Sequence, residues 1–408
     1  MTGHHDIRFA RLYLHVFACA ACVLPVASYV LSTYGWRPGD IGIATATVAI
    51  AGVVATPFWG RLDDRTTWAP RVAVLACAAA AVLAALTLGR APHALTWLAL
   101  GLFGVAEGPL DPLLTTRVLA SGLHGPRLGR VRAFGSLGWV LGLGLAATVL
   151  TLWPGHAEWV WIAAAVTAVA APASWGAGAR AGAGEPSADQ PGSVPGPGPR
   201  PPLRAVLGVL VVAFPTSMAM SVMVQFTAGW AHQELSAGPF LALAPIALSA
   251  ALELPVFPLI DRLARHRSPL LITVLAGPPL AVAIAVLALA PSSGSMLGVQ
   301  PLIALSFSLL FVGQSRMLSA AVPPERQASA QTLGSALING VGQLLAGIVG
   351  GRLADAFGYS GLFGCLVGLT AAGTLIGGVA LLRARRRPQL GSAACPAAPD
   401  RATVPSDQ

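Results

Sequence analysis

Residues 39–65 read GDIGIATATVAIAGVVATPFWGRLDDR, a long apolar run that ends in a charged cluster. The part from 39 to 60 has the roughly 20 mainly apolar residues that an α-helix needs to cross a bilayer. Asp40 is its only charged residue, and it lies at the start. Backbone polar groups must be satisfied internally in lipid, so this run predicts a transmembrane helix followed by a short loop at the membrane surface.

The whole chain has the composition of this segment. Its 408 residues are 55% hydrophobic and only 10% charged, whereas a soluble domain carries roughly 25% charge. Twelve stretches are long and apolar enough to span a bilayer. We therefore predict an all-α membrane protein with transmembrane helices over 10–32, 39–60, 71–89, 94–117, 129–152, 157–178, 203–229, 238–260, 269–290, 296–318, 328–350 and 359–382.

The stretch 180–202 differs from the spans, because it is rich in glycine and proline and almost free of large apolar side chains. Such a composition is typical of a flexible linker. We predict an N-terminal six-helix half over 1–179, a cytoplasmic linker over 180–202, a C-terminal six-helix half over 203–383 and a disordered tail over 384–408. A proline-bearing helix end followed by Asp-Arg occurs in both halves, as in transporters built from two related repeats.

Arginine placement predicts the orientation. Every basic residue is an arginine, and with the N-terminus inside only Arg37, Arg90 and Arg352 fall in outer loops. Cytoplasmic loops carry the excess of positive charge. We therefore expect both termini in the cytoplasm and a multi-pass protein of the plasma, or inner, membrane.

Other broad classes of function find little support. A net charge of +9 would suit nucleic acid, but the arginines separate apolar segments. Cys19 and Cys22 form a CxxC inside a span, without the second pair or nearby histidines of a zinc site. No HExxH or GxSxG motif occurs. We expect no enzyme activity, metal, cofactor or nucleic-acid partner. The expected partners are the bilayer and a small solute, and we expect a monomer.

The charged cluster at the end of the quoted segment also carries a family signature. Residues 60–65, GRLDDR, resemble the G-x-L-x-D-R motif of the major facilitator superfamily. The resemblance implies twelve helices in two pseudo-symmetric six-helix halves. It also implies a cytoplasmic gate, assigned to Gly60, Asp64, Arg65, Asp261 and Arg262.

Three further motifs narrow the branch. Residues 107–112 read EGPLDP, residues 129–139 read GRVRAFGSLGW, and residues 253–255 read ELP. Together they resemble the lactose-permease-like, phenylpropionate-permease-like and nucleoside–proton-symporter-like transporters. The resemblance implies that Arg132 and Trp139 bind and stack on the solute and that Glu253 matches an acid of the branch.

The chain departs from that branch in the span 296–318. Symporters of the branch usually carry Q-x-L-H, but this chain reads Gln300-Pro301-Leu302-Ile303. Proton coupling through that histidine is therefore ruled out, and coupling through carboxylates is left open. Of the signatures of drug antiporters, the span 94–117 lacks R-x-x-Q-G and the span 129–152 lacks G-P-x-x-G.

Charged groups inside spans are costly and are functional by default. Glu107 and Asp111 are four residues apart and should share a helix face, so one of them should bind a proton or pair with Arg132. Arg132, Ser136 and Trp139 form one stripe that suits a ring-bearing or anionic solute. A static Asp111–Arg132 pair and a membrane-anchoring Trp139 are the structural alternatives.

Glu253 lies deep in its span and is the best candidate for a proton carrier or a hydrogen-bonding solute ligand. Alternatively, Glu253 is a neutral acid with a structural role, which donates a hydrogen bond to a backbone carbonyl group that Pro255 or Pro258 leaves free. Gln225, Asn339 and Gln343 either line a cavity or hold helices together.

We predict a secondary active transporter that moves a sugar, an aromatic acid or a nucleoside by alternating access, with proton symport favoured. The alternative is an efflux carrier of the same fold for a metabolite or a drug. The candidate solute-binding residues are Arg132, Ser136, Trp139, Asp111, Gln225, Asn339 and Gln343. The candidate proton-coupling residues are Glu253, Glu107 and Asp111.

Overall fold

The computed structural model describes residues 3–66, 68–120, 126–174, 203–320, 334, 338 and 340–386. These residues form helices joined by turns, and among them there is no β-strand. The prediction of an all-α protein is confirmed. The predicted linker at 180–202 and nearly all of the predicted tail lie outside the described residues.

The helices form two groups along the chain, which we name the N-terminal half and the C-terminal half. The N-terminal half consists of α1 (Gly3–Val23), α2 (Ala27–Thr33), α3 (Pro38–Arg65), α4 (Ala69–Thr87), α5 (His93–Glu107), α6 (Leu110–Ala120), α7 (Pro126–Leu152) and α8 (Trp159–Ser174). The C-terminal half consists of α9 (Leu203–Leu235), α10 (Pro239–Ala264), α11 (Pro269–Val274), α12 (Gly277–Leu289), α13 (Ser293–Gly298), α14 (Gln300–Ala320) and α16 (Val341–Arg386).

Each of the twelve predicted spans overlaps a described helix. Within the described residues, nine segments are long and apolar enough to cross a membrane. The predicted spans 94–117 and 157–178 fall on the shorter helices α5, α6 and α8. The last predicted span, 359–382, and residues 341–350 of the span before it lie on α16, which is kinked at Gly358, where φ is 69°.

Proline interrupts four of the spans that we predicted as continuous helices. The interruptions lie at Pro25, at Pro109, before Pro278 and before Pro301. Proline lacks the N–H group and crowds the carbonyl group four residues earlier, so breaks of this kind need another donor inside a membrane.

The break at Pro109 shows how the chain supplies that donor. Pro109 leaves the carbonyl oxygen of Val105 without its helical N–H partner. The indole Nε1 of Trp59, on α3, donates a hydrogen bond of 2.8 Å to this oxygen. The buried Trp59 side chain therefore stabilises the bend between α5 and α6.

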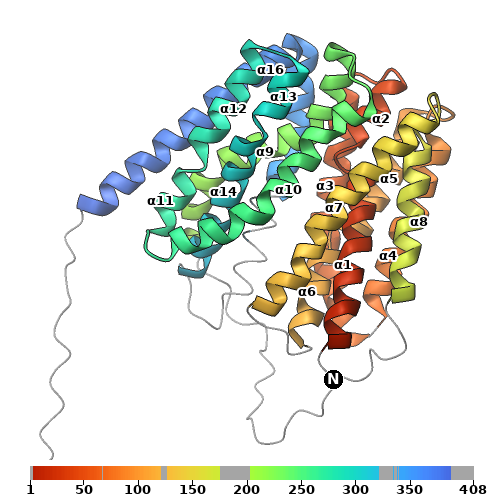
Figure 1. Cartoon of the computed structure of the whole chain (residues 1–408), viewed down its shortest axis with the longest axis horizontal. Helices are drawn as coiled ribbons and strands as arrows, with labels where there is room; N and C mark the ends of the chain where they lie inside the picture. The colour runs from red at the N-terminus through yellow and green to blue at the C-terminus, as the bar shows by residue number, and fades with distance from the viewer. Residues whose placement is uncertain are drawn as a thin grey trace, which may run out of the picture.

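The two halves lie side by side (Figure 1). They touch through α3 against α16, α2 against α9, and α7 against α10. The ribbons of the halves lie closest at the end opposite the N-terminus and diverge toward the N-terminal end (Figure 1). We name these the closed end and the N-terminal end.

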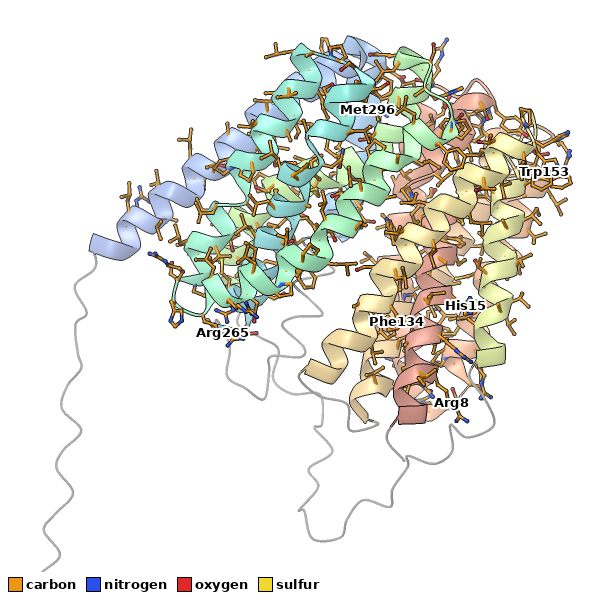
Figure 2. All side chains as sticks on the ribbon, in the orientation of Figure 1. Arg8, His15, Phe134, Trp153, Arg265 and Met296 are labelled. Carbon is orange, nitrogen blue, oxygen red and sulfur yellow. The ribbon has the colours of Figure 1, made fainter. Side chains whose placement is uncertain are left out.

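Large apolar side chains cover the periphery of the protein, where Figure 2 shows many of them directed outward. Leu289 is 86% exposed, and Leu375 and Val166 are also strongly exposed. Extensive apolar exposure of this kind marks a surface that another phase or partner covers. Together with the nine long apolar segments, it identifies a multi-pass membrane protein.

Candidate functional site

Two glycines bring α3 and α16 into backbone contact at the closed end. A Cβ atom on Gly42 would lie 2.1 Å from the carbonyl oxygen of Gly347, and one on Gly347 would lie 2.5 Å from the carbonyl oxygen of Gly42. Backbone atoms cannot yield as a flexible side chain can. Only glycine at these two positions allows the halves to approach so closely.

Hydrogen bonds across the halves lie in the same region. The amide of Gly229, on α9, donates to the hydroxyl of Ser28 at 3.1 Å. The side chain of Gln233 donates to the carbonyl oxygen of Trp36 at 3.4 Å. The closed end is therefore held by backbone approach together with neutral hydrogen bonds.

Gln225 is central to this arrangement. Its Oε1 accepts a hydrogen bond of 2.8 Å from Thr45 of α3, and its Nε2 donates one of 3.0 Å to the carbonyl oxygen of Gln343. Gln225 is buried, and both ends of its amide are occupied. The structure therefore presents Gln225 as a connector between helices, whereas the sequence left this role and cavity lining open.

We expect Gln225→Leu to weaken the closed end, because it removes both bonds at nearly unchanged volume. Of the two bonds, only the one from Thr45 joins the two halves. It contributes about 1 kcal/mol, so the equilibrium between conformations should shift roughly fivefold. The measurement is transport rate and apparent KM in vesicles. A lower maximal rate at unchanged KM is expected, whereas a large rise in KM alone would show that Gln225 contacts solute.

The stripe predicted on 129–152 lies on α7. Gly135, Gly138 and Gly142 pack against α1, where a Cβ atom on Gly138 would lie 2.3 Å from the carbonyl oxygen of Leu14. Ser136 and Trp139 lie beside this glycine face and are partly exposed. The side chain of Arg132 and all of Asn339 lie outside the described part of the chain.

Glu253 lies in the middle of α10, the helix of the C-terminal half that contacts α7. It is partly exposed, and among the described residues it makes no hydrogen bond or ion pair. Its own helix contains Pro255 and Pro258. An acid inside a span without a fixed partner is able to take up a proton or a solute hydroxyl group.

An ion pair that the sequence did not single out joins two helices at the N-terminal end. Arg117 of α6 donates to Asp63 at the end of α3, with an N···O distance of 2.5 Å. In the C-terminal half, Arg316 of α14 lies 3.8 Å from Asp261 of α10. Helices α3 and α6 of the N-terminal half correspond to α10 and α14 of the C-terminal half. This correspondence is the signal that could have identified both ion pairs.

The predicted gate residues are placed as follows. Asp261 contacts Arg265 and Arg316, while Arg65 and Arg262 are exposed. A Cβ atom on Gly60 would have no other atom within 4 Å. The side chain of Asp64 lies outside the described residues, and its neighbour Asp63 makes the ion pair. The gate assignment stays a prediction.

A second polar cluster joins three turns at the closed end. The carboxylate of Glu158 accepts a hydrogen bond from Tyr34, and it lies 3.3 Å from His156 and 3.8 Å from Arg90. Burial and the adjacent Glu158 raise the pKa of Tyr34 to about 12. Burial opposes the charge of Glu158, but hydrogen bonds from Tyr34, its own backbone and His156 outweigh that effect and lower its pKa.

This cluster predicts a pH-dependent stability. Because the pKa of Glu158 is lowered in the folded state, its contribution is present above the unfolded value of about 4.3 and is lost as the pH falls through the folded value. Glu158→Gln should cost about 1–3 kcal/mol at neutral pH and almost nothing in acid. Thermal unfolding of both proteins across this pH range measures the difference. A constant difference would contradict the assignment.

Comparison with known proteins agrees with this architecture. The family described as the MFS_1 like family matches residues 7–365. The chain belongs to this major facilitator family. No curated protein matches it.

Solved structures of major facilitator transporters share the fold. The nucleoside transporter NupG superposes with a TM-score of 0.72 at 16% identity, over 92% of this chain and 98% of that one. A point mutant of NupG superposes with a TM-score of 0.76 at 14% identity, over 92% of this chain and 99% of that one. A bacterial homologue of the human lysosomal transporter Spinster, in an inward-facing and occupied conformation, gives 0.69 at 14% identity, over 93% and 96%. At these identities the likeness shows the fold alone.

Proposed function

We propose that this major facilitator protein carries a small organic solute between its two halves by alternating access, with a proton moving in the same direction. We place the N-terminus in the cytoplasm, so that the closed end faces outward and the N-terminal end, where the halves diverge, faces the cytoplasm. The expected location is the plasma, or inner, membrane. The family membership supports transport as the general activity.

The observation that carries the proton coupling is Glu253. It is the acid of α10 without a fixed partner among the described residues, and α10 touches α7 of the opposite half. An ionised carboxylate inside a span costs about 2.5–3.5 kcal/mol on insertion scales. A proton that binds when the site faces one side and leaves on the other would relieve this cost.

Aromatic side chains near the same helices favour a ring-bearing solute. Trp139 and Ser136 lie on α7, and Phe257 lies one turn from Glu253 on α10. Phe257 packs edge-on against Phe311, with ring centroids 5.6 Å apart. Aromatic faces of this kind bind planar rings. Nucleosides, as for NupG, aromatic acids and sugars are therefore the solutes to examine first.

The test is uptake of radiolabelled uridine, phenylpropionate and lactose by reconstituted vesicles under an imposed proton gradient. For Glu253→Gln, we expect gradient-driven accumulation to fall to the level of empty vesicles while solute exchange continues. Arg132→Ala should lose both activities, because it is assigned to solute binding. Glu234→Gln is the matched control, since this acid already has a partner in Trp230 at 3.0 Å.

The outcomes separate symport from the efflux alternative. Uptake that does not depend on the proton gradient and is unchanged in Glu253→Gln would overturn the assignment of Glu253 as the proton carrier. Solute release that is driven by the opposite gradient would favour efflux of the same compound.

A further inference from the structure

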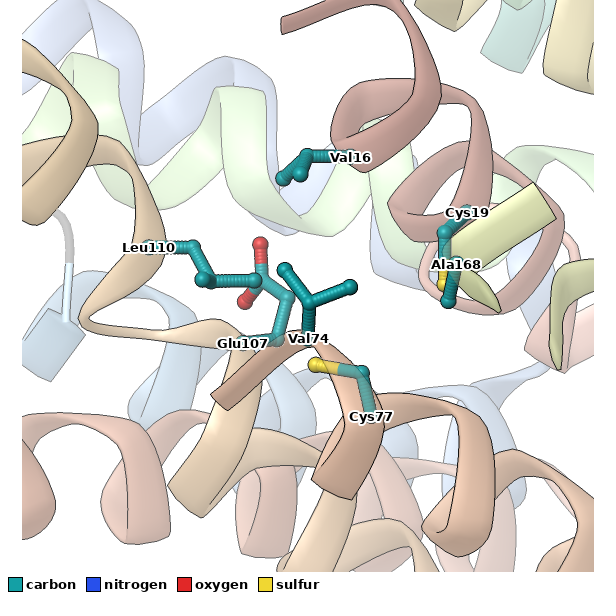
Figure 3. Close-up of a pocket in the computed structure, with 7 residues that line it drawn as sticks. All are labelled: Val16, Cys19, Val74, Cys77, Glu107, Leu110 and Ala168. Carbon is teal, nitrogen blue, oxygen red and sulfur yellow. The ribbon is translucent and has the colours of Figure 1, made fainter. Parts of the chain in front are cut away.

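A small cavity lies inside the N-terminal half, apart from the contact between the halves. Its lining comes from α1, α4, α5, α6 and α8, and no residue of the C-terminal half contributes. Figure 3 shows the carboxylate group of Glu107 directed into the space between Val16, Val74 and Leu110. Glu107 is therefore held away from the solute pathway proposed above.

The direction of Glu107 follows from the packing of α5. A Cβ atom on Gly104 would lie 2.2 Å from the carbonyl oxygen of Val48, and one on Gly108 would lie 2.6 Å from the Cα atom of Gly52. These glycines fix one side of α5 against α3. Glu107 lies about a quarter turn away from them, so its side chain points toward α1 and α4.

The described groups that face Glu107 provide no positive charge. Its neighbours in the cavity are the thiols of Cys19 and Cys77 together with apolar side chains. Among the described residues, Glu107 makes no hydrogen bond or ion pair. The nearest further acid is Asp111, in the first turn of α6. Burial, with no counter-charge in the described part of the chain, and a second carboxyl group nearby both favour a bound proton on Glu107.

The interruption of the helix makes this site sensitive to conformation. Pro109 lies between Glu107 and Asp111, and α5 and α6 meet there at the bend that Trp59 stabilises. Movement of α6 relative to α5 would change the distance between the two carboxyl groups. Affinity for a proton would change with it.

We propose that Glu107 is a second proton-binding site, built into the N-terminal half between Cys19 and Cys77, and that it exchanges its proton while the protein stays folded. It deepens the proposed function, on which its role in transport rests. The existence of the site depends only on the cavity and its lining.

The test is infrared difference spectroscopy of the full chain in lipid, in buffer without solute. Above about pH 6, exposed carboxyl groups stay ionised, so a protonated-carboxyl band that disappears reversibly toward pH 9 comes from buried acids. We expect Glu107→Gln to lose about half of this band and Glu253→Gln to lose the rest. Glu107→Asp should keep a shifted band, which guards against misfolding of the glutamine variant.

Glu158→Gln is the matched control, since this acid is nearly buried but already bonded to Tyr34, and it should leave the band unchanged. A Glu107→Gln spectrum identical to that of the unchanged protein would overturn the proposal, because Glu107 would then be permanently neutral or permanently ionised. The measurement needs no solute, so a failed uptake assay would count against the proposed function and leave this site standing.

Discussion

Gly42→Trp should abolish transport and leave the closed end open. The carbonyl oxygen of Gly347 lies 2.1 Å from the position of a Cβ atom on Gly42, so any larger side chain must push α3 and α16 apart. Overpacking of this kind costs about 1–3 kcal/mol. At the upper end, the equilibrium between conformations shifts roughly a hundredfold. The carrier would then be held in the conformation that is open at this end.

An engineered thiol reports the position of these helices. Ala46 is 3% exposed at the same contact, so Ala46→Cys should react with a membrane-impermeant maleimide only when the closed end opens. We expect strong labelling of Ala46→Cys when it is combined with Gly42→Trp, and little labelling of Ala46→Cys alone. Gly144→Trp is the matched control, because nothing lies within 4 Å of the Cβ position at Gly144. Normal transport by folded Gly42→Trp would contradict the role of this contact.

Asp63→Asn should destabilise the N-terminal half substantially. The side chains of Asp63 and Arg117 are only 12% and 20% exposed, and their atoms meet at 2.5 Å. Loss of one partner from such a pair leaves an uncompensated charge, at a cost of about 2–3 kcal/mol after allowance for partial exposure. Arg117→Ala should cost a similar amount, because it strands the other charge.

A double substitution measures the interaction energy between Asp63 and Arg117, apart from the contacts that each makes with its surroundings. Asp63→Asn with Arg117→Ala should cost clearly less than the sum of the single variants, since neither charge is then stranded. Arg265→Ala is the control, because Arg265 is 63% exposed beside Asp261, and exposed pairs contribute about 0–1 kcal/mol. Thermal unfolding in detergent provides the comparison. Additive costs would show that the two side chains act independently.

The fold was predictable because its main signal is the length of each apolar run. Helix breaks were not predicted, although Pro25 and Pro109 are visible in the sequence. A proline in a span can either kink a continuous helix or end it. The outcome depends on whether a distant side chain, such as Trp59, reaches the carbonyl group left free.

The site was predictable only in part, because sequence spacing gives a helix face but not the neighbour that covers it. Glu107 and Asp111 are four residues apart and were expected on one continuous helix, but the bend places them on α5 and α6. Gln225 was a candidate ligand, and its two hydrogen bonds come from positions about 120 and 180 residues away. Such partners leave no trace in local patterning.

The contact between Gly42 and Gly347 has a consequence for the medium in which the protein works. Its forces are short-range packing and neutral hydrogen bonds, which dissolved ions barely alter. Charged pairs, by contrast, are screened over a Debye length of about 8–10 Å at moderate ionic strength. Closure at this end should therefore depend little on salt concentration, so the balance between conformations there should be nearly the same in dilute and in concentrated salt.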